Sequence, residues 1–111
     1  MEHPRQIPES DWKIWREMQK LALERFCQNA LNDVAKFKDA EGTAHERYLK
    51  LYQLVKKRDK KLGEIFDGPS RSNALTQIAL AVQARLVTAD EVNRFTEETR
   101  NKVAFLTGEV G

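Results

Sequence analysis

Apolar side chains recur every three or four positions through most of this chain, which is the spacing of an amphipathic α-helix. The first run extends over residues 10–39 without a glycine or proline. Its apolar positions are Trp15, Met18, Ala22, Phe26, Ala30, Val34 and Phe37. No segment shows the alternation with period two that is typical of strands. The pattern therefore predicts an all-α protein.

Local start signals divide the rest of the chain into further helices. Thr43 with Glu46, and Thr88 with Glu91, have the spacing of a capping box, in which the hydroxyl accepts an amide proton and the carboxylate reaches back. Thr96 marks a third start. The predicted helices are 10–39, 44–66, 71–86, 89–95 and 97–107.

These elements predict one helical domain over residues 10–107, between an extended, partly mobile arm (1–9) and a C-terminal tail (108–111). A length of 111 residues is enough for one core and too short for two. We expect a long antiparallel hairpin of residues 10–39 and 44–66, with the three shorter helices packed across it.

The first helix carries two apolar faces, because its early stripe points about 120° away from its later one on an ideal helix. It would be about 43 Å long, against a diameter of roughly 34 Å for a compact chain of this length. We expect the early face, with Trp12, Trp15 and Met18, to bind a partner helix or a second copy in a homodimer. The alternative is that the short C-terminal helices cover it within the monomer.

Basic residues gather on the second helix, although the whole chain has a formal charge of only +2. Residues 43–69 hold seven basic and four acidic side chains. The helical wheel places Lys50, Lys57, Lys60 and Lys61 on the outer face. A solvated face is the simpler interpretation, and a phosphate-contacting face for nucleic acid is the alternative.

Arg58 and Asp59 fall within the apolar arc of the second helix, where a charge needs a partner or a wet cavity. A hairpin in which the numbers of facing residues sum to about 83 places Asp59 opposite Arg25 or Glu24. We predict an Arg25–Asp59 pair between the helices, with a polar pocket as the alternative.

Catalytic and metal-binding patterns are missing from the sequence. Cys27, His3 and His45 are its only cysteine and histidines, and no two of them have metal-ligand spacing. In the predicted hairpin Cys27 and His45 would lie roughly 15 Å apart along the axis, too far for a nucleophile and its base. There is no glycine-rich phosphate-binding motif. We expect no enzyme activity, no metal and no cofactor.

A single cysteine favours the cytoplasm, and no apolar run is long enough to cross a membrane. The segments WKIWRE (12–17) and ALERFC (22–27) resemble small uncharacterised bacterial helical proteins, a family with no activity attached. The resemblance implies a bacterial, cytoplasmic, helical protein. The sequence predicts a non-enzymatic module for protein interaction or self-association. The alternative is a nucleic-acid-binding accessory protein that uses the basic face of the second helix.

Overall fold

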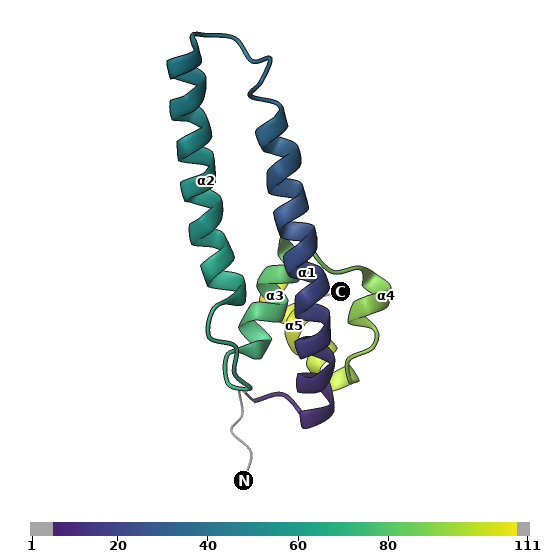
Figure 1. The fold of residues 1–111 in the computed structure, drawn as a ribbon. Coiled ribbons are helices and arrows are strands. Elements are labelled where there is room, and N and C mark those ends of the chain that lie inside the picture. The colour runs from purple at the N-terminus through teal and green to yellow at the C-terminus, as the bar shows by residue number, and fades with distance from the viewer. Residues whose placement is uncertain (1–5, 109–111) are drawn as a thin grey trace.

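The structure, a computed structural model, describes residues 6–108, which form five α-helices and no strand (Figure 1). The helices are α1 (Glu9–Ala35), α2 (Ala44–Phe66), α3 (Ala74–Gln83), α4 (Ala89–Val92) and α5 (Glu97–Thr107). α1 and α2 are in contact as an antiparallel pair, and α3 packs against α1, α2 and α5. The predicted all-α fold, with a long hairpin and shorter helices packed against it, is confirmed.

The hairpin projects from a small globular part, so the molecule is elongated. Its extents are 58 × 27 × 23 Å and its radius of gyration is 16.8 Å, against about 13 Å for a compact chain of this length. α3, α4 and α5 gather around the N-terminal half of α1 (Figure 1). We call residues 27–64 the stalk and the rest of the described chain the head.

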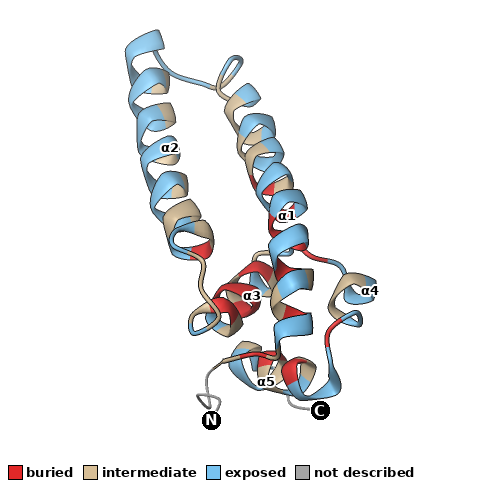
Figure 2. Cartoon of the chain, turned by 60° about the horizontal axis from the view of Figure 1, so that its bottom comes forward, coloured by how far each residue is buried: buried red, intermediate tan, exposed pale blue. Residues whose placement is uncertain are grey.

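The hydrophobic core lies entirely in the head (Figure 2). No residue from 27 to 64 is buried. The last buried side chain of α1 is Phe26, whose ring meets that of Phe66 edge-on at 6.1 Å. The buried apolar residues are Ile7, Trp15, Met18, Ala22, Phe26, Ile65, Ala74, Ile78, Ala79, Ala81, Leu86, Val87, Phe95 and Val103.

Three predicted helix starts are confirmed by their hydrogen bonds. The hydroxyls of Thr43, Thr88 and Thr96 each accept from the backbone N–H three residues later. At Thr88 the capping box is complete, because the carboxylate of Glu91 accepts the Thr88 N–H at 2.8 Å. Such bonds join residues a few positions apart, which is why the sequence predicts them.

Several predicted bounds are wrong by a few residues. α1 begins at Glu9 after Pro8 rather than at Ser10, and it ends at Ala35 rather than 39. α3 covers 74–83 rather than 71–86, because Ser70 and Asn73 close a turn through two reciprocal bonds between side chain and backbone before the helix begins. α4 covers 89–92 rather than 89–95.

The predicted N-terminal arm is docked where the structure describes it. Ile7 is only 2% exposed, and its carbonyl oxygen accepts from Nη2 of Arg71 at 2.8 Å. Ile7 therefore belongs to the packed core, and the mobility of the rest of the arm stays a prediction. The predicted arm's residues 1–5 and the tail's residues 109–111 lie outside the described chain.

The register of the hairpin differs from the prediction by about eight residues. Arg58 pairs with Asp33, and Phe66 contacts Phe26, so the numbers of facing residues sum to 91 and 92 rather than about 83. The loop of residues 36–43 extends beyond the C-terminal end of α1 before α2 begins (Figure 1). Each residue of α2 therefore faces a position in α1 further along the chain than predicted.

Candidate functional site

The predicted interface of Trp12, Trp15 and Met18 is largely part of the head's core. Trp15 is 0% exposed and Met18 3%, and Trp15 Nε1 donates to Oε1 of Gln77 in α3 at 3.4 Å. Trp12 is half-buried, with the Arg16 guanidinium 5.5 Å from the centre of its ring. The prediction of a partner surface at Trp15 and Met18 is wrong, because the head covers both side chains within one chain.

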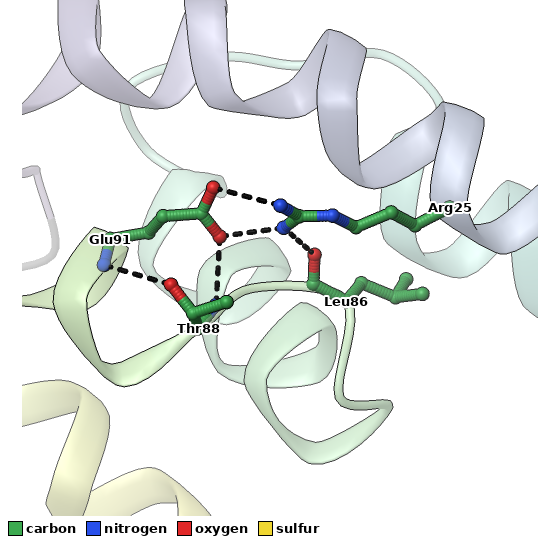
Figure 3. Close-up of polar contacts among 4 residues, drawn as sticks. All are labelled: Arg25, Leu86, Thr88 and Glu91. Atoms are coloured by element: carbon green, nitrogen blue, oxygen red, sulfur yellow. Dashed lines mark hydrogen bonds and ion pairs between the residues drawn. The ribbon is translucent and has the colours of Figure 1, made fainter.

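Arg25 does not pair with Asp59, which is exposed on α2. Arg25 Nη1 instead donates to Glu91 Oε1 at 2.6 Å and to the Leu86 carbonyl oxygen at 2.9 Å. Arg25 Nη2 donates to Glu91 Oε2 at 3.1 Å (Figure 3). The predicted Arg25–Asp59 pair does not form, because the hairpin register is shifted and because Glu91, the acid of the Thr88 capping box, binds the Arg25 guanidinium.

This contact sets the charge state of Glu91. The hydrogen bonds from Arg25, helped by the backbone N–H of Thr88, lower the pKa of Glu91 to about 2. The bond to Glu91 also raises the pKa of Arg25. The pair fastens the start of α4 to the middle of α1 and therefore serves the fold of the head.

The polar contact inside the hairpin is made by Arg58, the other charged residue of the apolar arc. Its Nη2 donates to the carboxylate of Asp33 in α1. The bond from Arg58, followed by one from Lys36, lowers the pKa of Asp33. A charge on the inner side of α2 thus finds its partner across the hairpin, as its position requires.

The two sides of the stalk differ in chemistry. One side holds a hollow of about 570 Å³, which we call the polar hollow, lined by Asn29, Asn32, Lys36, Lys61 and the Asp33–Arg58 pair and, where it meets the head, by Phe26, Ala84 and Leu86. The other side holds a groove of about 300 Å³ with mainly apolar walls. The walls of the groove are Phe26, Cys27, Ala30, Leu31, Val34, Leu54, Val55 and Leu62, with Arg58 and Asp59 beside them.

The groove belongs to a larger apolar surface that runs along the stalk. Tyr48, Tyr52 and Val55 follow one another at helical spacing on the groove side of α2. Toward the tip Tyr48 lines a second hollow of about 350 Å³ together with Val34 and Leu51. We call this surface the apolar stalk face, defined by Cys27, Leu31, Val34, Tyr48, Tyr52, Leu54, Val55 and Leu62.

The apolar stalk face is open to solvent. Leu31, Tyr48, Tyr52 and Val55 are 62%, 63%, 52% and 51% exposed. The other four members are partly exposed. Single exposed apolar residues are ordinary, but a contiguous apolar patch that follows two helices is typical of an interaction surface.

The four lysines predicted on the outer face of α2 are open to solvent. Lys50, Lys57, Lys60 and Lys61 are all exposed. Lys61 lies 3.6 Å from a carboxylate oxygen of Glu64, and it also lines the polar hollow. Whether this face contacts phosphate stays a prediction.

The remaining candidates for chemistry lie apart. Cys27 is half-buried against the groove, and His45 is exposed in the first turn of α2. Within residues 6–108 no three histidine, cysteine or acidic side chains are grouped so that they would hold a metal ion. No helix in the same range is long and apolar enough to span a membrane.

A polar centre that the sequence does not indicate lies at Asp11. This residue stands in the first turn of α1 and is 0% exposed, and its carboxylate accepts three hydrogen bonds from the start of α5. The repeated threonines at 96 and 99 are the only local signal, and they do not indicate which acid they bind.

Comparison of the chain with protein-family models, with curated proteins and with solved structures gives no match. The resemblance to small bacterial helical proteins therefore stays a prediction.

Proposed function

We propose that this protein is a non-enzymatic helical module that self-associates through the apolar stalk face. The observation that carries the proposal is the separation between core and stalk. Every buried apolar side chain of residues 6–108 lies in the head, whereas Leu31, Tyr48, Tyr52 and Val55 stay more than half exposed on a single side of the hairpin. A second copy of the same face would remove these side chains from water.

The size of the face fits a two-fold contact. A fully exposed aromatic side chain presents roughly 200 Å² and an aliphatic one somewhat less, so the four most exposed members add up to roughly 400 Å² per chain. Specific interfaces begin at about 600 Å² per partner and include a polar rim, so the partly exposed members and the polar residues around the face would supply the rest. When one patch binds its own copy around a two-fold axis, assembly stops at the dimer. We therefore propose a homodimer.

The chemistry of the face supports the same partner. Its two tyrosines combine a large apolar ring with a hydroxyl that keeps a hydrogen bond at a wet rim, which suits protein interfaces. The groove between α1 and α2 offers a concave seat for a side chain of the second copy. Asp59 and the neighbouring lysines place charges at the edges of the face.

The test is the mass in solution from low to high micromolar concentration, measured by sedimentation equilibrium. The wild-type protein should approach the dimer mass as concentration rises, and Leu31→Lys and Tyr52→Lys should each weaken the dimer at least tenfold. Phe105→Lys is the matched control, because Phe105 is the most exposed large apolar residue, at 73%, and lies in the head. A monomer mass at every concentration would refute the proposal.

A second candidate is nucleic-acid binding by the basic face of α2. It is favoured by the exposure of Lys50, Lys57, Lys60 and Lys61 and by the cations Lys36 and Arg58 beside the polar hollow. Neutralising phosphates makes affinity fall steeply with salt. A mobility shift with bulk DNA or RNA that weakens with salt and with Lys57→Gln/Lys60→Gln would support it. No shift at low salt would rule it out.

We further propose a cytoplasmic location, on the ground that one cysteine suits a reducing compartment. A fluorescent fusion that leaves the cytoplasm would contradict this part of the proposal.

A further inference from the structure

A pocket of about 330 Å³ opens in the head between the end of α3, α4 and α5, away from the stalk. Its apolar lining includes Val82, Val87, Val92 and Val103. Two guanidinium-bearing residues, Arg85 and Arg100, line the same pocket. Among residues 6–108 neither arginine forms an ion pair, and no acidic side chain lines this pocket.

Arg100 lines the pocket from α5. The residue is partly buried on α5, and its Nε–H is out of contact with water and without a hydrogen-bond partner. A buried donor normally has a partner, because leaving it unpaired costs free energy. Because Nε is closed to water, it does not face the open space of the pocket, and a carboxylate bound there would meet the positive charge at the Nη groups of Arg100.

Arg85 occupies a backbone position that suits glycine. It follows the last turn of α3 with φ +59°, the only non-glycine residue with positive φ among residues 6–108. The N–H of Arg85 bonds Val82 O at 3.0 Å and that of Leu86 bonds Ala81 O at 2.9 Å, the pattern of a helix end that glycine usually completes. A side chain here costs stability relative to glycine, and this one lines the pocket.

We propose that the head pocket binds a small organic monocarboxylate with a short branched or aromatic body. A guanidinium fork matches the two oxygens of a carboxylate, and it is the group that proteins most often use for planar anions. The valine side chains would hold the apolar body. The volume lies at the lower end of the range for ligand pockets, about 300–1,000 Å³, which suits a small acid. This site is independent of the stalk and of the proposed dimer.

The test follows the arginine Nε–H signals of the ¹⁵N-labelled full chain by NMR during titration with benzoate and with 3-methylbutanoate. The Arg100 Nε–H signal should shift in a saturable manner with both acids. Benzamide, which has the same ring without the charge, and inorganic phosphate, which has the charge without the body, should bind at least tenfold more weakly. Equal responses to benzoate and benzamide, or to benzoate and phosphate, would overturn the assignment.

Two variants tie the binding to the two arginines. Arg100→Gln should reduce benzoate affinity at least tenfold, as followed by backbone amide shifts around the pocket. Arg85→Gly should also weaken benzoate binding, while it raises the midpoint of thermal unfolding because glycine suits the left-handed position. The matched control is Arg94→Gln, which removes an exposed guanidinium that does not line the pocket.

The outcomes separate a ligand site from a purely structural arginine. Weaker binding in a more stable Arg85→Gly protein cannot result from misfolding, so this result supports the site. The absence of any saturable shift in the wild-type protein, or unchanged benzoate affinity in both arginine variants, would overturn it.

Discussion

Asp11 and Thr99 stand 88 positions apart in the sequence, and the Thr99 hydroxyl donates a 2.6 Å hydrogen bond to the Asp11 carboxylate. The hydroxyl and the backbone N–H of Thr96 donate to the same carboxylate at 2.7 and 2.9 Å. Both residues of the first pair are buried. The start of α1 is thus fastened to the start of α5, where a negative charge also suits the helix dipole.

Loss of the Asp11 carboxylate should destabilise the head. Asp11→Ala leaves the donors of Thr96 and Thr99 without their acceptor, and we expect a loss of about 3 kcal/mol in the free energy of unfolding. Urea unfolding followed by circular dichroism measures it. Glu9→Ala, at an exposed position of the same helix turn, should stay within about 0.5 kcal/mol of wild type. An equally small effect for Asp11→Ala would show that the three bonds contribute little.

Stability should fall in acid because of Glu91. Its pKa is about 2 in the folded state against an ordinary value of 4.5. The carboxylate therefore contributes stability that is fully present above pH 4.5 and is lost as the pH falls toward 2. The contribution is on the order of 2 kcal/mol. Unfolding measured across this pH range should show a loss in wild type that is smaller in Glu91→Gln. Identical pH profiles for the two proteins would contradict the role of the Arg25 contact.

Stability should depend on the head much more than on the stalk. Ile78→Ala removes a fully buried side chain and should cost about 3 kcal/mol, whereas Leu31→Ala should cost less than about 1 kcal/mol. Both are measured by urea unfolding at a protein concentration where the chain is monomeric. A cost for Leu31→Ala that approached that of Ile78→Ala would mean that the stalk contributes to the core.

Cys27 reports on the proposed dimer. It is half-buried beside the apolar groove, so a thiol reagent should label it more slowly than a free thiol. If two stalks pair through this face, labelling should slow further as protein concentration rises, and Tyr52→Lys should remove that dependence. A labelling rate that does not change between low and high micromolar protein would contradict pairing through the apolar stalk face.

The sequence predicts the features that depend on neighbouring residues. The helix starts at Thr43, Thr88 and Thr96 follow from contacts within a single turn, and the all-α class follows from periodicity. It does not predict the hairpin register, because the path of residues 36–43 decides how far α2 extends past α1. Nor does it predict pairs between residues far apart in the sequence, such as Arg25 and Glu91, because these depend on how the helices pack.

The two apolar faces of α1 show a different limit. Periodicity detects that the faces diverge, but it cannot indicate whether the same chain or a second molecule covers each one. The head covers the face with Trp15, which was the alternative considered for it. The face left open on the stalk includes Tyr48 and Tyr52 of α2, and neither tyrosine was predicted to bind a partner.

Because the core is confined to the head, the hairpin is a long projection that is anchored at one end only. α2 is held at its base by Ile65 and by the Phe26–Phe66 contact, and its 23 residues extend about 34 Å. A tilt of about 10° at that base therefore moves the tip by about 6 Å, as much as a full helical turn. A small repacking around Ile65 and Phe66 would thus displace Tyr48 by several ångströms. The displacement of the tip for a given tilt increases with the length of α2.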